Sequence, residues 1–381
     1  MIKAIALCLL FSGVMPALAA RDVSVAKLEN ELNGLRGKPD KEIVRKLEGI
    51  VLTERLSTTR LVELEKSLPG PGSRAALLAL ADASIFQKLP ASEQVAKPAP
   101  DAETQAAMLR SAANYAAQAL SKLPNFFATQ RITHFEDAPA FHRDAVYLPP
   151  EPLHAVSSAR AVVLYRDGKQ VVDWQNGKSA NDAPPILGLI TSGEFGPILG
   201  TVLADAAQGR IEWSHWEHGS TGDEAVFMYE VPRAKSHYDV KFCCVESDTA
   251  SIFEQFSGYH GEIALDPAGG AILRITMLAD LKPANPVSKA SVMVEYGAVE
   301  IGGKSYICPR RSVAEVQAYQ QAAPKSPDEP PSYFALHSDE LNSAEKGELQ
   351  TLLNDVTYEQ YHLFRSESRV ITSNESAPDK N

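Results

Sequence analysis

The stretch that decides the fold runs from Ser257 to Val316. It reads GYHGEIALDPAGGAILRITML over residues 258–278 and ASVMVEYGAVEIGGKSYICPRRSVAEV over residues 290–316. Turn residues at 266–270 and at 302–303 separate runs of β-branched and apolar side chains, which is the pattern of strands that pair through tight hairpins. The stretch therefore predicts an antiparallel β-meander, and it contains no catalytic motif.

Further strands are expected on either side of this meander. Asp167-Gly168 suits the positive φ angles of a tight hairpin between two short apolar runs. A loop rich in Pro and Ser at 322–332 precedes a last alternating run. The expected strands outside the meander are 125–135, 161–165, 170–174, 210–216, 225–231, 238–244 and 354–372.

Residues 22–87 have the apolar spacing of four short helices. The first runs from Val25 to Leu35 and stops at Gly37. Asp40 is the expected N-cap of the second and Ser57 that of the third, and the fourth is alanine-rich over 74–86. The apolar stripe of the second helix is expected to contain Ile43, Leu47, Ile50 and Val51. We interpret the stripes as the core of a small helical domain, and the alternative is a groove that binds a partner.

Two more helices are expected later in the chain. Asp101 caps a longer helix that Pro124 ends, and residues 193–207 form another, with Thr191 or Ser192 as its N-cap. Ser192 does not fit a nucleophile elbow, because Ile190 and Glu194 occupy the two glycine positions of that motif.

The first nineteen residues have the features of an export signal. Lys3 gives a positive start, residues 5–14 an apolar core, and Ala17-Leu18-Ala19 a small-x-small cleavage site. The apolar run is too short to cross a bilayer as a permanent helix, and no second long apolar segment follows. We expect an exported chain, periplasmic or secreted, with no integral membrane segment after signal cleavage.

The net charge limits the classes of partner that the protein can bind, and the cysteine content limits the disulfides that it can form. The formal net charge of −11 is dispersed, which argues against nucleic acid and anionic membrane surfaces as partners. Cys8 leaves with the signal, so Cys243, Cys244 and Cys308 remain. In an oxidising compartment Cys308 could pair with Cys243 or Cys244, and the alternative is three buried thiols.

The candidate chemical groups do not assemble into a motif. His215 and His218 flank Trp216-Glu217, but on a strand they point to opposite sides, and Glu212 shares a face with His218 alone. A metal site would need a third ligand such as His237 or His260. Arg274, inside an apolar strand, is expected to face solvent or pair with a carboxylate rather than bind a ligand. We therefore expect no catalytic residue, no metal ligand and no cofactor site.

The order of elements from Asp101 to Val316 resembles a known fold. An amphipathic helix leads into Asn125–Gln130, and a hairpin at 167–169, a helix from Gly193 and a long meander follow. This order resembles the periplasmic lipoprotein-carrier (LolA/LolB-like) family. The resemblance implies a curved antiparallel sheet, covered by helices, that binds acyl chains. The phrases LTERLSTTRL, LADAS, LPNFFATQ and TSGEFG also resemble a family of uncharacterised exported bacterial proteins.

These observations predict an α+β protein in which a small N-terminal helical domain precedes a half-barrel-like curved antiparallel sheet covered by helices. The expected units are a signal peptide (1–19), the helical domain (20–92), a linker (93–100), the covered sheet (101–320), a loop with a short helix (321–353), a terminal strand (354–372) and a disordered tail (373–381).

Three functional hypotheses follow. The first is an exported non-enzymatic protein that binds an apolar ligand, a lipid or a lipidated protein inside the sheet. The second is a structural or interaction protein that binds an envelope protein through its N-terminal helices, and the third is an unrecognised hydrolase. They differ in whether the inner face of the sheet, with Ile263, Leu265, Ile272 and Val292 as candidates, is filled or open.

Overall fold

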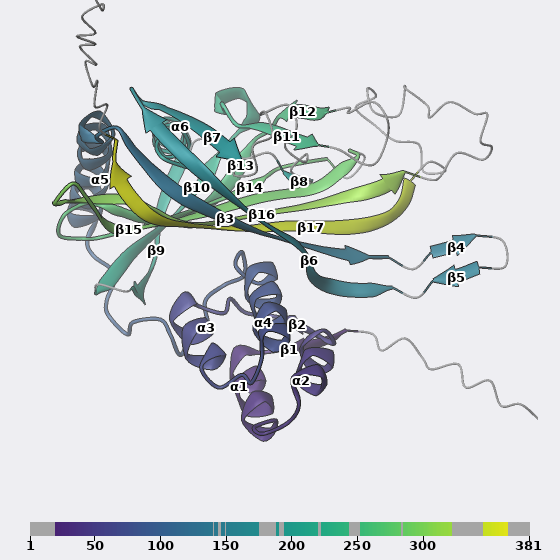
Figure 1. Cartoon of the computed structure of the whole chain (residues 1–381). Coiled ribbons are helices and arrows are strands. Elements are labelled where there is room, and N and C mark those ends of the chain that lie inside the picture. The colour runs from purple at the N-terminus through teal and green to yellow at the C-terminus, as the bar shows by residue number, and fades with distance from the viewer. Residues whose placement is uncertain are drawn as a thin grey trace, which may run out of the picture.

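The computed structural model describes residues 20–139, 141–143, 146–148, 150–174, 188–189, 194–219, 222–243, 252–282, 285–321 and 346–364. Within these ranges the protein is an α+β structure with six α-helices and a ten-stranded antiparallel sheet that does not close on itself (Figure 1). No helix in the described ranges has the length and apolar character needed to cross a membrane.

Residues 21–83 form a helical domain with a two-stranded parallel sheet. Its elements are β1 (Arg21–Val23), α1 (Val25–Gly34), α2 (Asp40–Leu47), β2 (Ile50–Leu52), α3 (Thr58–Glu65) and α4 (Pro71–Ala83). Ser24 and Ser57 cap α1 and α3 through their hydroxyl groups. Leucines of all four helices and residues of β1 and β2 share one core cluster, so the apolar stripes form the interior of this domain.

Two predictions about this domain are wrong. Ile50 and Val51 do not continue the second helix, because β2 pairs in parallel with β1 directly after Gly49. Asp40 does not cap α2, whose N-cap is Pro39. Its carboxylate instead accepts backbone N–H bonds of 3.1 and 3.0 Å from Gly72 and Ser73 in the first turn of α4. Asp40, which was predicted to cap its own helix, therefore connects α2 to the first turn of α4.

The large sheet has the strand order β7-β6-β3-β17-β16-β15-β14-β13-β10-β9. The strands are β3 (Phe126–Ala138), β6 (Glu151–Arg166), β7 (Lys169–Trp174), β9 (Arg210–His218), β10 (Asp223–Val231), β13 (Tyr259–Leu265), β14 (Ile272–Ala279), β15 (Val287–Ile301), β16 (Lys304–Gln321) and β17 (Lys346–Leu363). The predicted meander is confirmed, since β13 to β16 are consecutive antiparallel neighbours. Gly270, Gly302 and Gly303 have positive φ angles in its turns.

The last strand occupies a place that local patterns do not reveal. β17 begins at Lys346, eight residues before the expected start, and lies between β16 and β3. It therefore joins the meander to the β3-β6-β7 strands. The expected positions 365–372 of this strand and the loop at 322–332 lie outside the described residues.

Two helices and several short strands complete the fold. They are α5 (Ala102–Lys122), α6 (Pro197–Ala206), β4 (Phe141–Arg143), β5 (Val146–Leu148), β8 (Gly188–Leu189), β11 (Asp239–Cys243), β12 (Ile252–Phe256) and the 3-10 helix η2 (Arg233–Lys235). Asp101 caps α5 as predicted. The predicted cap of the second helix is wrong, because α6 begins at Pro197 with Gly196 as its N-cap, and proline is favoured at the first helical position.

The large sheet has a different neighbour on each face. Side chains of α5, α6 and β11 share a core cluster with alternate residues of the strands, including Ala314 and Val316 of β16. We call this side the α5/α6 face. Val313, which directly precedes Ala314, instead packs with Ala79 and Ile85 of the helical domain, which lies beneath the sheet in Figure 1. We call this side the domain face. The half-barrel curvature stays a prediction.

A substitution at Gly261 tests whether the close approach of β13 and β14 requires glycine at this position. A Cβ atom at Gly261 would lie 1.9 Å from the carbonyl oxygen of Thr276 on β14. We expect Gly261→Ala to lower the free energy of unfolding by about 1–3 kcal/mol, since the backbone must shift. Gly34→Ala is the control, because no atom lies within 4 Å of a Cβ there and alanine favours helix by about 0.5–1 kcal/mol. Urea denaturation measures both, and equal stability of the two variants would contradict the prediction.

Candidate functional site

A β-bulge in β9 determines which face of the sheet each side chain around the His-Trp-Glu-His stretch lies on. Phe227 pairs with Trp213 and Val226 with His215, so Ser214 is the extra residue. His215 and His218 point to opposite faces as predicted, and His218 pairs with Asp223 at 3.2 Å. The predicted face of Glu212 is wrong: because of the bulge, Glu212 lies on the face of His215. The bulge also brings the rings of Trp213 and Trp216 together, with centroids 4.9 Å apart.

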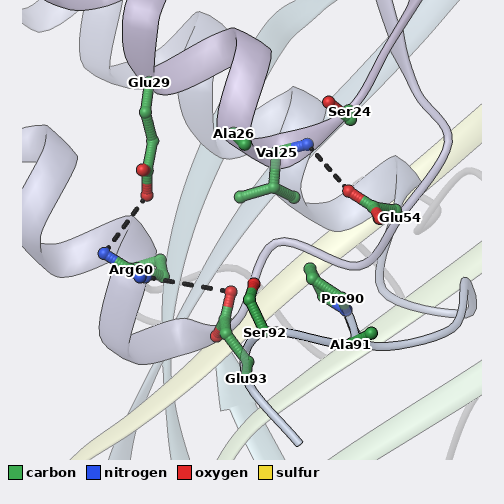
Figure 2. Close-up of a pocket in the computed structure, with 10 residues that line it drawn as sticks. All are labelled: Ser24, Val25, Ala26, Glu29, Glu54, Arg60, Pro90, Ala91, Ser92 and Glu93. Carbon is green, nitrogen blue, oxygen red and sulfur yellow. Dashed lines mark hydrogen bonds and ion pairs between the residues drawn. The ribbon is translucent and has the colours of Figure 1, made fainter.

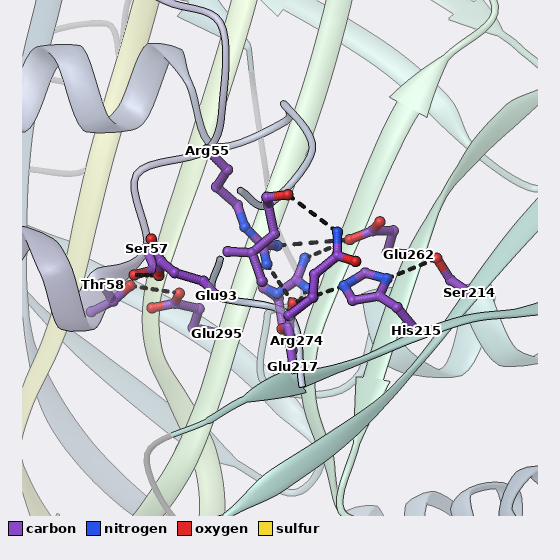
Figure 3. A network of polar contacts seen from close by, with 12 residues as sticks. Arg55, Ser57, Thr58, Glu93, Ser214, His215, Glu217, Glu262, Arg274 and Glu295 are labelled. Carbon is purple, nitrogen blue, oxygen red and sulfur yellow. Dashed lines mark hydrogen bonds and ion pairs between the residues drawn. The ribbon is translucent and has the colours of Figure 1, made fainter. Parts of the chain in front are cut away.

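His215 and Glu217 face the helical domain, where they join a buried ion-pair network (Figure 3). Arg274 of β14 donates to Glu217 at 2.8 Å and to Glu262 of β13 at 3.1 Å. Arg55, between β2 and α3, also contacts both carboxylates, Glu217 by a short hydrogen bond and Glu262 at 3.7 Å. Arg55, Arg274 and Glu217 are each 5% exposed. The prediction that Arg274 pairs with a carboxylate is confirmed.

A second charged cluster joins α4 to the same face of the sheet. Arg311 of β16 donates through Nε to Asp355 of β17 at 2.7 Å. Its Nη2 donates to Asp82 of α4, which is fully buried. Arg55 and Asp82 are thus two charged side chains by which the helical domain contacts the sheet, and each contacts an oppositely charged partner.

The electrostatics of the two clusters are those of structural ion pairs. Although burial favours the neutral acid, the Arg274 guanidinium holds the pKa of Glu217 well below its usual range. Burial, and then the charge of Glu217, raises the pKa of Glu224 to about 7. Burial also raises the pKa of Asp82. Perturbed pKa values mark catalytic sites when they occur in a cleft, but these groups are buried, and Glu217 and Asp82 lie in contacts between the helical domain and the sheet.

The helical domain carries a pocket on its own surface (Figure 2). Arg60 of α3 lies across it, with Glu29 at 3.3 Å and Glu93 at 3.8 Å. Glu54 accepts a hydrogen bond of 3.1 Å from the backbone N–H of Val25 at the start of α1. The pocket has a volume of about 220 Å³ and is lined by Ser24, Val25, Ala26, Glu29, Glu54, Arg60, Pro90, Ala91, Ser92 and Glu93.

The α5/α6 face of the sheet is packed with side chains. Ile263, Leu265, Ile272 and Val292 are each at most 3% exposed and belong to one cluster with residues of α5 and α6. A crevice between Tyr115, Phe195 and Tyr296 holds about 20 Å³, room for about one water molecule. Pockets for small molecules have volumes of roughly 300–1,000 Å³.

The remaining sequence candidates lie apart from one another. His237 contacts Asp205 at 2.6 Å, and His260 contacts Asp280 at 2.8 Å. Among the described side chains, no group of three or more His, Cys, Asp or Glu residues is arranged to hold a metal ion. Thr191 and Ser192 lie outside the described residues.

Cys308 is a free, buried thiol, so of the two alternatives for this residue the structure has the buried thiol and not the disulfide. Burial raises its pKa to about 12, and a thiol that stays protonated is a poor nucleophile. Cys243 ends β11, and Cys244 lies outside the described residues.

No family model matches this chain, and no curated protein or solved structure is similar to it, so the likeness to lipoprotein carriers stays a prediction.

Sequence reasoning missed Arg55 and Asp82. Arg55 follows Thr53 and Glu54 in the polar part of LTERLS and gives no local signal, whereas Asp82 is a lone acid in the apolar stretch LALADASIF. An isolated charge among apolar residues, such as Asp82, is a usable signal, because charged residues are rarely buried unless they are paired. Their partners are 162 and 229 residues away in the chain, and no local pattern identifies them.

Arg274→Met tests whether the buried network holds the fold together. Removing the guanidinium leaves Glu217 and Glu262 without one of their two arginines, and we expect a loss of about 3–5 kcal/mol in the free energy of unfolding. Arg21→Met is the matched control, because Arg21 pairs with Glu31 at the surface and exposed pairs contribute little. Chemical denaturation measures both. Similar losses in the two variants would show that the network does not stabilise the protein.

Proposed function

We propose that this protein is an exported, non-enzymatic interaction protein in which the large sheet supports the helical domain and the helical domain binds a partner. The observation that carries the proposal is the packing of the α5/α6 face. The crevice beside Tyr296 holds about 20 Å³, whereas an acyl chain or another apolar ligand needs roughly a few hundred. This contrast favours an interaction protein over a lipid carrier.

The position of β1 is compatible with export. β1 starts at Arg21, two residues after the expected cleavage site at Ala19, and Val23 is buried against the core of the helical domain. Cleavage near Ala20 would therefore leave β1 complete. The pairing of β1 with β2 would also hold the new N-terminus against the domain.

A role without catalysis is supported by how the ionisable groups are used. The acids and arginines with the strongest interactions contact one another across the domain face, where substrate has no access. The pocket of Figure 2 lies instead on the free surface of the helical domain, and its three carboxylates outnumber its one guanidinium. We place the partner there, and the charge favours a basic segment of that partner.

Native mass spectrometry of the gently purified exported protein tests the first part of the proposal. We expect the mass of a chain that begins near Ala20 or Arg21, with no bound lipid. An organic extract of the same sample should contain no stoichiometric lipid. A co-purified lipid at one per chain would contradict the proposal and favour the carrier hypothesis, and N-terminal sequencing that starts at Met1 would contradict export.

Site-specific photo-crosslinking in cells tests the second part. A photoreactive residue at Ala26 of α1, which is exposed and lines the pocket, should give a discrete product whose partner contains a basic segment. The same residue at Phe256 of β12, which is 54% exposed, is the control and should give none. Arg60→Ala changes the pocket, so it should reduce the Ala26 product. Identical products from both positions would contradict a partner site on the helical domain.

A further inference from the structure

The interface between the helical domain and the sheet has an apolar centre and, beside it, a group of charged side chains. The apolar centre comprises Leu78, Ala79, Ile85 and Phe86 of the helical domain against Phe135, Leu153, Met293, Val313 and Leu353 of the sheet region. Beside it lies the network of Arg55, Glu217, Glu262 and Arg274. Arg311, which contacts Asp82 and Asp355, lies next to this network, because Glu295 is the cross-strand neighbour of both Arg274 and Arg311.

Acids outnumber arginines in this interface. Besides the four carboxyl groups in those contacts, Glu224 lies near Glu217, and Glu295 accepts a hydrogen bond of 2.9 Å from Thr58 of α3. Six carboxyl groups therefore face three guanidinium groups: Asp82, Glu217, Glu224, Glu262, Glu295 and Asp355 against Arg55, Arg274 and Arg311.

The other charged groups on this face do not remove the excess. Lys289 forms its own pair with Glu315 at 2.8 Å, and Glu65 adds another acid near Arg311 and Asp355. His215 could add one positive charge beside Glu217 when it is protonated. On the linker, Lys97 lies 3.8 Å from Asp223, the residue before Glu224.

Two of the acids are buried on the domain face. Glu224 is 8% exposed, and it is the cross-strand neighbour of Glu217, which Arg55 of the helical domain contacts. Asp82 is fully buried, and its Oδ2 has no hydrogen-bond partner in the described part of the chain. A buried carboxylate in excess of its counter-charges is unfavourable, and it is neutralised most simply by binding a proton.

We propose that docking of the helical domain on the sheet is coupled to proton uptake, with Glu224 and Asp82 as the groups that take up the protons. The helical domain then acts as a pH-sensitive latch over the charged face of the sheet, independently of which partner it binds. When the domain separates from the sheet, water reaches both acids and they release their protons.

The sign of the effect follows from the raised pKa of Glu224. An acid whose pKa is higher in the docked state stabilises docking fully below its free pKa of about 4.5. That stabilisation is lost as the pH rises towards about 7, the docked value. In this window the docking equilibrium should fall roughly tenfold per pH unit. Asp82, whose pKa burial also raises, should add to the loss.

Hydrogen exchange of the exported chain at pH 5, 6, 7 and 8, corrected for the intrinsic exchange rate, tests this proposal. Peptides from α4 and from 350–357 of β17 lie on opposite sides of the interface. Their protection should fall together by roughly a hundredfold between pH 5 and 7, while peptides from the cores of α1 and α2 change little. Protection that does not depend on pH, or that falls equally in every peptide, would contradict the proposal that docking is coupled to proton uptake.

Glu224→Gln keeps the shape of the side chain and removes its charge, so protection in this variant should depend much less on pH between 5 and 7. Glu359→Gln is the control, because Glu359 pairs with Arg131 on the exposed part of β17, and it should behave like the original chain. A Glu224→Gln profile identical to that of the control would overturn the assignment of Glu224.

Discussion

The arrangement of this protein depends on charge pairing across the domain face of the sheet. Taking an arginine or a carboxylate out of water costs several kcal/mol, and only a well-placed counter-charge offsets that cost. Arg55 and Asp82 enter this face from the helical domain, and each contacts an opposite charge on the sheet. An apolar contact alone tolerates small shifts, whereas these contacts hold the domain in one orientation. Compared with apolar residues of similar size, buried ion pairs of this kind favour one relative orientation of the helical domain and the sheet more than they lower the free energy of the docked state.

Irregularities in the strands bring the carboxylates of this network together. The bulge at Ser214 orients Glu217 towards the domain face while Trp213 and Trp216 pack on the α5/α6 face. At β13, the absence of a side chain at Gly261 lets the backbone of Thr276 approach closely, and the Thr276 hydroxyl accepts a hydrogen bond from the backbone N–H of Glu262. Both acids thus depend on local departures from regular pairing. Such departures are common where a sheet must direct a particular side chain.

How much of this could be predicted from the sequence depends on the distance between the interacting residues. The meander, the cap of α5 and the divergence of His215 and His218 follow from neighbours within a few positions, and those predictions are confirmed. The insertion of β17 between β16 and β3 joins segments more than 200 residues apart. Alternation along a strand gives no information about which strand lies beside it. The role of Asp40 fails for the same reason, since its hydrogen bonds reach α4, 32 residues away.

The same limit explains why the likeness to lipid carriers leads to a different proposal. Alternating apolar residues such as Ile263 and Val292 are compatible with an open cavity or a filled core. Which one occurs depends on side chains from other elements. Phe195, just before α6, packs against Phe126 and Tyr358 with ring centroids 5.4 and 5.1 Å away. The same face also buries polar atoms of Gln130, Ser312 and Tyr358. A filled, partly polar face suits a support for the helical domain better than it suits a lipid site.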